Sequence, residues 1–472
     1  MTTFATSAKP GSDLLPAVLG GQPAVTLDQK AANRWPIITE EDEREVLRVL
    51  RTGELSSGHL PAAMGGYPCP HPEVLALECA FAEHLGLPVF DVGDFIPAMA
   101  GKGFRTAPNV LAHNNGTAAI LGGLHALGVG PGDEVIVPST TWWSSVLTVL
   151  HAGGIPVFAE TDIKTLALDP ADVEAKITDR TKAVIVTHLF GIPADMDGLV
   201  AVCKKHGVKL MEDASHAHGA TYKGKKIGLI GDVAAFSLQV NKLVPSAEGG
   251  LLVCKDPELM LTAARLGHYE RLVPLKAIDH PMARFAATGF GFKFRMSPVS
   301  AALARAQLSH LEERNARRNA NCIYLSKRLE EIGRGAIHAY LDPADEPGTK
   351  RVYFEFLVRY DAAKAGGVPI KALTKALKAE GCDVAAPRYP LLHQQPVFTE
   401  GEWVKLARLE NGGGVPGLKL PTYDPAALPR TTAGNGTLIK LPAFPQADRA
   451  LLDQYCTAFE KVFANLDRLP KE

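Results

Sequence analysis

The chain has 472 residues, more than one compact core normally contains, so the length predicts two lobes. Hydrophobic residues make up 46% and charged residues 21% of the chain, the profile of a globular protein. The formal net charge of -1 gives no basic field to recruit nucleic acid, and no stretch reaches the roughly 20 apolar residues of a membrane helix.

Seven cysteines are scattered along the chain, without a C-x-x-C pair or zinc-type histidine spacing. An odd, dispersed set of this kind is typical of reduced thiols. The N-terminal residues lack a basic segment followed by a sustained apolar run, so no signal peptide is predicted. We expect a cytoplasmic protein that has no metal site and binds neither membranes nor nucleic acids.

The N-terminal region combines an arm with a helix. Residues 1–34 are rich in Ala, Gly, Pro and Ser and are predicted to form an extended arm. A helix is predicted over 39–53, with Thr39 as its cap and an apolar face that includes Leu47 and Leu50.

Between about residues 110 and 254, short apolar strands alternate with helices through short connections. This pattern predicts an α/β fold with a mostly parallel central sheet made of right-handed crossover units. Two stretches without this regularity, 87–108 and 401–436, are predicted to be loop insertions.

A strand turns into a helix at Asn115, Gly116 and Thr117. Free backbone N–H groups and the positive helix end would face this loop, which favours a phosphate site, although an ordinary turn gives the same pattern. The glycine-rich run GVGPGDEV follows a helix and precedes a strand, the wrong order for a dinucleotide-binding loop, so a nicotinamide dehydrogenase is disfavoured.

The stretch from Lys209 to Gly250 concentrates the groups most suited to chemistry. A short buried strand ends at Asp213, and a second strand, VAAFSL, leads to Lys242. A desolvated lysine can form a Schiff base with an aldehyde cofactor, and an aspartate can keep a pyridine nitrogen protonated. Taken singly, the aspartate also fits a helix cap and the lysine a solvated surface group.

The segments EDASHAHGA, GD-x-x-x-FS and K-x-x-x-x-x-EGG, together with the NGTAA box, resemble the DegT and StrS group of sugar aminotransferases. This resemblance implies a pyridoxal 5'-phosphate enzyme with the type I aminotransferase fold. Its large cofactor-binding domain would span 35–313, and a smaller C-terminal α+β domain would span 314–472.

The resemblance also implies site residues. Lys242 would hold the cofactor and move the substrate proton, and Asp213 would contact the ring nitrogen. The other implied cofactor contacts are Gly116, Thr117, Ala118 and Ser237 at the phosphate, Trp142 stacked on the ring, and His216 at the 3′ oxygen; Trp143 is expected to be a packing residue.

Lys293, in the GFGFKFRM segment, stands where family members use an asparagine to reach the phosphate of the neighbouring subunit. The implied assembly is therefore a homodimer with shared active sites. Candidate substrate contacts are Ser56, Ser57, His188, Arg388, Tyr389 and His393, with turn or core roles left open for Ser56, Ser57 and His188.

The motifs are most similar to the branch that acts on ketocyclitols such as scyllo-inosose. The predicted reaction moves an amino group from glutamate or glutamine to a keto-sugar or ketocyclitol. Two alternatives remain at this point. One is a pyridoxamine-dependent sugar dehydratase, although those proteins carry His in place of Lys242, and the other is a non-catalytic regulatory protein on the same fold.

Overall fold

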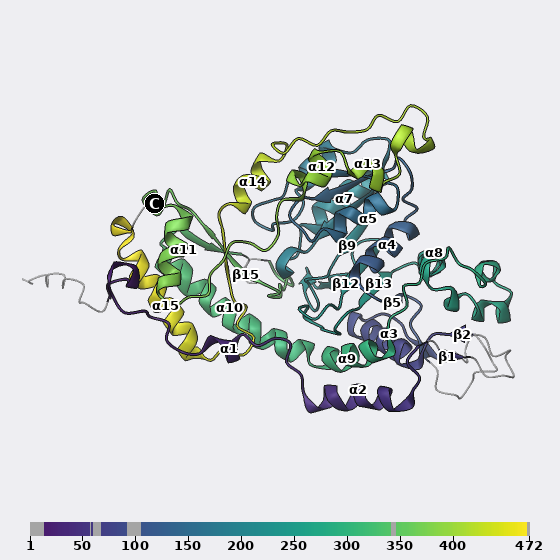
Figure 1. The fold of residues 1–472 in the computed structure, drawn as a ribbon, viewed down its shortest axis with the longest axis horizontal. Helices are drawn as coiled ribbons and strands as arrows, with labels where there is room; N and C mark the ends of the chain where they lie inside the picture. Colours follow the sequence, from purple (N-terminus) through teal and green to yellow (C-terminus); the bar gives the residue numbers. More distant parts are fainter. Residues whose placement is uncertain (1–13, 57, 60–67, 92–104, 341–345, 470–472) are drawn as a thin grey trace, which may run out of the picture.

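The computed structural model describes residues 14–56, 58–59, 68–91, 105–340 and 346–469 (Figure 1). Within these ranges no helix is both long and apolar enough to cross a bilayer. Nor does the described part of the chain bring together three His, Cys, Asp or Glu side chains in a way that could hold a metal ion. Of the predicted insertion at 87–108, the described ends pair as β3 (Phe90–Asp91) and β4 (Arg105–Thr106).

A seven-stranded sheet forms the centre of the larger lobe. Neighbouring strands are parallel from β12 through β9, β8 and β6 to β7, and β13 is antiparallel to both β12 and β5. This confirms the predicted α/β fold with a mostly parallel sheet. In sheet order the strands are β5 (Val110–His113), β13 (Gly250–Cys254), β12 (Val233–Ser237), β9 (Lys209–Asp213), β8 (Thr181–Thr187), β6 (Glu134–Pro138) and β7 (Ile155–Ala159).

Helices cover both faces of this sheet, so its apolar side chains alternate between two buried layers. In β8, Val184 and Val186 lie in one layer and Ala183 and Ile185 lie in the other. The first layer lies under α3 (Pro72–Leu85), α6 (Pro170–Ala175), α7 (Met196–His206) and α9 (Pro298–Ser309), and the second under α4 (Gly116–Ala126), α5 (Ser144–His151) and α8 (Pro257–Gly267).

The helix α10 (Leu311–Gly333) leads from the larger lobe to the smaller one (Figure 1). The smaller lobe has an antiparallel sheet of β14 (Ile337–Ala339), β15 (Phe356–Tyr360) and β16 (Leu438–Leu441), packed against α11 (Ile370–Ala379) and α15 (Arg449–Phe463). The predicted boundary at 314 falls in the first turn of α10, and the division into domains stays a prediction.

The described part of the N-terminal arm lies on the smaller lobe. It contains the short helix α1 (Gln29–Ala32), and Val25 N donates to Glu380 O at 2.9 Å. The Glu380 carboxylate accepts from Ala24 N at 2.9 Å and from Lys461 Nζ at 2.8 Å. A buried ion pair with additional hydrogen bonds fixes the arm in one place.

The helix predicted over 39–53 is present as α2 (Glu40–Thr52), with Thr39 and Asp42 forming a capping box. Its predicted apolar face does not pack as expected. Val49 is buried, whereas Leu47 and Leu50 are 44% and 45% exposed, because α2 lies along the outside of α9 (Figure 1). Those two leucines therefore form an outward apolar surface.

The stretch 401–436 is less loop-like than predicted. It contains the short helices α13 (Trp403–Leu406) and α14 (Pro429–Asn435). Trp403, Leu409 and Leu428 are buried in the same apolar layer as α4 and α5. This segment therefore packs against α5 and β7 at one side of the large lobe.

Candidate active site

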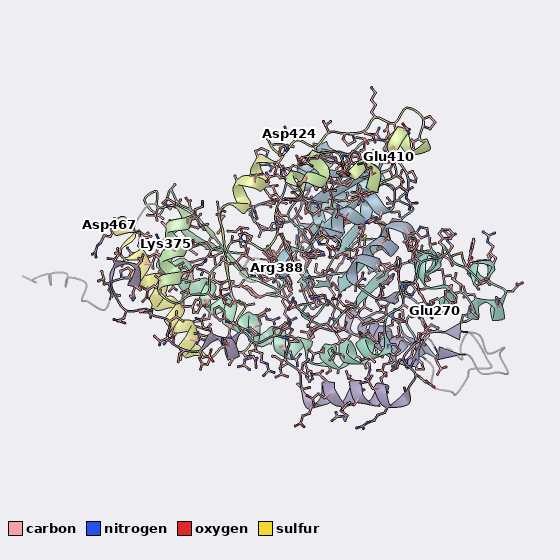
Figure 2. The ribbon with its side chains drawn as sticks, in the orientation of Figure 1. Glu270, Lys375, Arg388, Glu410, Asp424 and Asp467 are labelled. Atoms are coloured by element: carbon pink, nitrogen blue, oxygen red, sulfur yellow. The ribbon has the colours of Figure 1, made fainter. Side chains whose placement is uncertain are left out.

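A cavity of about 420 Å³ opens at the carboxyl ends of β9 and β12, beside the N-terminus of α4. Parallel strands present their carboxyl ends at one edge of a sheet, which is where ligands bind in open α/β folds. Its lining includes many of the predicted residues: Gly116, Thr117, Trp142, Asp213, His216, Ser237, Lys242, Arg388 and Tyr389. Figure 2 shows Arg388 in the region where the two lobes meet.

The Asp213 carboxylate is buried at the end of β9 and is held by two donors. Ser215 N donates to Oδ1 at 3.1 Å, and Ser145 Oγ donates to Oδ2 at 2.5 Å. These two hydrogen bonds fix the carboxylate in place. A fixed carboxylate at this position suits a protonated ring nitrogen.

The Lys242 side chain enters the same cavity from the loop after β12. Its Nζ lies 4.5 Å from the centroid of the Phe354 ring. Burial lowers the pKa of this amine to about 8; the negative charge of Asp213 opposes the shift, and the Arg388 cation adds to it. At pH 7 about a tenth of Lys242 is consequently uncharged, far more than for an exposed lysine, and the neutral amine is the nucleophilic form.

The start of α4 forms the third side of the cavity. Asn115 caps the helix by accepting a hydrogen bond from Ala118 N at 2.8 Å. Ala118 was predicted to contact a phosphate, but its backbone N–H already donates to the Asn115 cap. Gly116 packs directly on Ser237, because a Cβ added at Gly116 would lie 2.7 Å from the Ser237 Cβ. Thr117 Oγ1 lies 2.7 Å from Ser144 Oγ.

Both tryptophans after β6 line the cavity and are partly exposed. The Trp142 ring contacts the Tyr389 ring edge to face at a centroid distance of 6.2 Å. Trp143 was expected to be a packing residue, yet it is 42% exposed and lies beside Trp142 at the cavity. Both indole rings are thus available to a ligand.

The His216 ring is buried and both of its nitrogens are occupied. Nδ1 accepts from Phe190 N at 3.4 Å, and Nε2 lies 3.1 Å from Tyr389 Oη. The ring also stacks on Phe354 at a centroid distance of 4.2 Å. The ring edge predicted to meet a cofactor oxygen therefore contacts Tyr389.

Two predicted histidines lie outside the cavity lining. His188 is buried, where Nδ1 accepts from Ala194 N at 3.1 Å and Nε2 donates to Glu212 at 3.0 Å. His393 Nδ1 lies 2.6 Å from Ser139 Oγ, and its Nε2 donates to the Pro425 carbonyl at 3.1 Å. Both histidine rings therefore have protein partners on each nitrogen and lie outside the lining of this cavity.

Ser56 and Lys293 line a different cavity, together with Arg271. In one chain, therefore, Lys293 and Lys242 do not share a cavity. Ser57 lies outside the described residues.

Several site residues were not predicted. Ser145 donates a hydrogen bond to Asp213, and the Phe354 ring contacts the Lys242 amine. The Glu355 carboxylate accepts from Arg388 Nε at 2.5 Å. Ser145 lies in the same STTWWSS segment as Trp142, which is the signal that could have indicated it. Phe354 and Glu355 come from the other lobe and have no local motif.

These groups fit pyridoxal phosphate. The Lys242 amine suits its aldehyde, and the fixed Asp213 carboxylate suits its ring nitrogen. The start of α4 beside Ser237 suits its phosphate, and the Trp142 ring suits the face of its aromatic ring.

A family model described as the DegT/DnrJ/EryC1/StrS aminotransferase family matches residues 100–416. An L-glutamine:2-deoxy-scyllo-inosose aminotransferase from Streptoalloteichus tenebrarius is 38% identical over 60% of this chain and 66% of its own length. An enzyme of the same name from Micromonospora echinospora is 33% identical over 78% of this chain and 85% of its own. A crystal structure of S. venezuelae DesV in complex with a ketimine intermediate has a TM-score of 0.67 and 29% identity, covering 95% of this chain and 100% of that chain.

Proposed function

The chain belongs to the DegT/DnrJ/EryC1/StrS aminotransferase family, whose cofactor is pyridoxal 5'-phosphate, and we propose that it moves an amino group from glutamine or glutamate to a ketocyclitol. The two inosose aminotransferases named above support this donor and this class of acceptor. The observation that carries the proposal is a partly neutral Lys242 amine in one cavity with a fixed Asp213 carboxylate.

When bound, pyridoxal phosphate supplies an aldehyde that captures amines and a ring that withdraws electrons from the adjacent carbon. Lys242 Nζ would hold that aldehyde in the resting enzyme. Once free, Nζ would act as the general base that takes the donor's α proton and as the general acid that gives a proton back. The presence of Lys242 disfavours the dehydratase alternative, whose members carry His at this position.

Asp213 would keep the ring nitrogen protonated, and the hydrogen bond from Ser145 holds the Asp213 carboxylate in place. Gly116, Thr117 and Ser237 would hold the phosphate at the positive end of α4.

A homodimer with shared active sites is part of the proposal. Lys293 is exposed and follows Phe292, which is 52% exposed, and elsewhere Leu47 and Leu50 of α2 are also exposed. Exposed aromatic side chains suit an interface with a second copy of the chain. Across such an interface, the Lys293 cation would reach the phosphate of the cofactor bound to that second copy. We also propose a cytoplasmic location, on the dispersed cysteines of the sequence.

The proposal is tested by the visible absorbance of the purified enzyme. Glutamine should bleach the band of the lysine-held cofactor, and a ketocyclitol of the scyllo-inosose type should restore it. Lys242→Ala should bind cofactor without that band and should not turn over, because no other described amine lines the cavity. Full transamination by Lys242→Ala would refute the assignment.

A further inference from the structure

Four aromatic rings lie nearly parallel beside the active-site cavity, and three of them, His216, Phe354 and Tyr389, line it. His216 stacks on Phe354 at a centroid distance of 4.2 Å, and Tyr389 lies 5.8 Å from His216 and 5.6 Å from Phe190. The interplanar angles within these pairs are 7°, 4° and 8°. Phe354 also carries Lys242 Nζ on its ring, so the stack extends to the catalytic amine.

The backbone fixes which nitrogen of His216 carries the proton. Phe190 N–H can only donate, and it points at Nδ1, which must therefore be the unprotonated acceptor. Burial and the nearby Lys242 cation lower the pKa of His216 well below its usual value, so the ring is neutral. Its single proton is consequently on Nε2 and is donated to Tyr389 Oη at 3.1 Å.

This hydrogen bond sets the direction of the Tyr389 hydroxyl. Because Oη accepts from His216, its own hydrogen must point elsewhere, and Tyr389 lines the cavity that contains Lys242. Among the described residues, the structure gives this hydroxyl no hydrogen-bond partner other than His216. The ring itself is held among Phe190, Leu357 and Leu438. A buried hydroxyl with a free donor in a cavity is a preorganised contact for a ligand oxygen.

We propose that Tyr389 Oη–H donates a hydrogen bond to the carbonyl oxygen of the acceptor, and that His216 is the positioning residue that orients this hydroxyl. The inference rests on the proposed function and specifies how its acceptor is bound. The groups suited to cofactor come from the edge of the large sheet and from α4, whereas Tyr389 and Arg388 belong to the segment that leads from α11 to β16 in the smaller lobe. A substrate would lie between the cofactor groups and this segment.

The chemistry balances without any added reactant. When the amine nitrogen that came from the donor attacks the carbonyl carbon of the ketocyclitol, a C–N bond forms. The C–O π bond breaks, and its electron pair moves onto the carbonyl oxygen. The Tyr389 hydroxyl stabilises that charge and keeps its own proton, since burial raises its pKa. The oxygen finally leaves as water with the two protons of the amine nitrogen.

The two half-reactions separate this role from cofactor binding. Tyr389→Phe should leave bleaching by glutamine unchanged and slow recovery of the band with ketocyclitol on the order of a hundredfold. His216→Phe keeps an aromatic ring in the stack but loses both hydrogen bonds, and should slow recovery about three- to tenfold. His216→Gln can still accept from Phe190 N–H and donate to Tyr389, and should restore most of the rate.

Two further readouts complete the test. In the Tyr389→Phe background, His216→Phe should cause no additional loss, and the ¹⁵N shifts of the His216 ring in the apoenzyme should report a neutral Nε2–H form. Tyr360→Phe is the matched control, because Tyr360 Oη donates to Val368 O at 2.9 Å within the smaller lobe, away from the cavity. It should leave both half-reactions unchanged.

Several outcomes would overturn the inference. Equal slowing of both half-reactions, or a shifted cofactor band in Tyr389→Phe, would assign the hydroxyl to the cofactor. Failure of His216→Gln to restore the rate would reduce His216 to packing. If the wild-type enzyme used glutamine and ketocyclitol and Tyr389→Phe did so equally well, this inference alone would fail. Inactivity of the wild-type enzyme with both substrates would instead contradict the proposed function.

Discussion

At the scale of single residues, the fold determines how reactive the Lys242 amine is. An exposed lysine has a pKa near 10.4 and is almost fully charged at neutral pH. Burial in the cavity brings the pKa of Lys242 to about 8, against the opposing influence of Asp213. The same aspartate is held in place by hydrogen bonds from Ser145 and Ser215.

The rate at which apoenzyme captures pyridoxal phosphate should therefore depend on pH. Only the neutral amine attacks an aldehyde, so the capture rate should rise with pH, with a midpoint at about 8, and then level off. Stopped-flow absorbance measures this directly. Asp213→Asn removes a charge that raises the pKa of Lys242, so its midpoint should move to lower pH. A rate that keeps rising to about pH 10, as for free lysine, would contradict the assignment.

At the scale of elements, the meeting of α4 with the end of β12 depends on a glycine. Gly116→Ala would place a Cβ 2.7 Å from the Ser237 Cβ, so the helix start or the strand end must shift. We expect cofactor affinity to fall about tenfold or more, measured by equilibrium dialysis, in a protein that still folds. Gly130→Ala is the matched control, since a Cβ there meets nothing within 4 Å. Equal affinity in both variants would show that the α4 start does not hold the phosphate.

The sequence predicted elements and local motifs better than contacts between distant segments. The parallel sheet and the helix from Glu40 to Thr52 follow from periodicity and capping, which are local signals. The outward position of Leu47 could not be predicted in this way, because an amphipathic pattern identifies an apolar face but not the element that covers it.

The same limit applies to the candidate site. Asp213 ends one strand and Lys242 lies in the loop after the neighbouring strand of the predicted sheet, so their placement in one cavity could be anticipated. His188 also follows a strand end, but Glu212 occupies its ring, and no sequence pattern announces that pairing. The contact of His216 with Tyr389 joins residues 173 positions apart and depends on how the two lobes meet.

At the scale of the whole molecule, the proposed dimer makes Lys293 part of the neighbour's active site. Lys293→Ala should weaken cofactor retention during dialysis without removing the band of the lysine-held cofactor. Mixing Lys242→Ala chains with Lys293→Ala chains gives a sharper test, provided that Lys293→Ala alone is impaired at limiting cofactor. Random pairing makes about half of the dimers mixed, and each would contain one intact site, so roughly a quarter of all sites should work normally.

If Lys293 acted within its own chain, no mixed dimer would contain an intact site. Activity no greater than the average of the two parent variants would then refute sharing through Lys293. Size-exclusion chromatography with light scattering should accompany the mixing, because the argument requires a dimer.

The central claim is that this enzyme transfers the α-amino group of its donor to a ketocyclitol through Lys242. The most direct measurement supplies glutamine labelled with ¹⁵N at the α-amino group, together with a scyllo-inosose-type ketone, and follows the label by mass spectrometry. Wild-type enzyme should give a labelled aminocyclitol from this substrate and an unlabelled one when only the side-chain amide of glutamine carries ¹⁵N, and Lys242→Ala should give no product. An unlabelled product from α-labelled glutamine, or a labelled product from Lys242→Ala, would contradict the central claim.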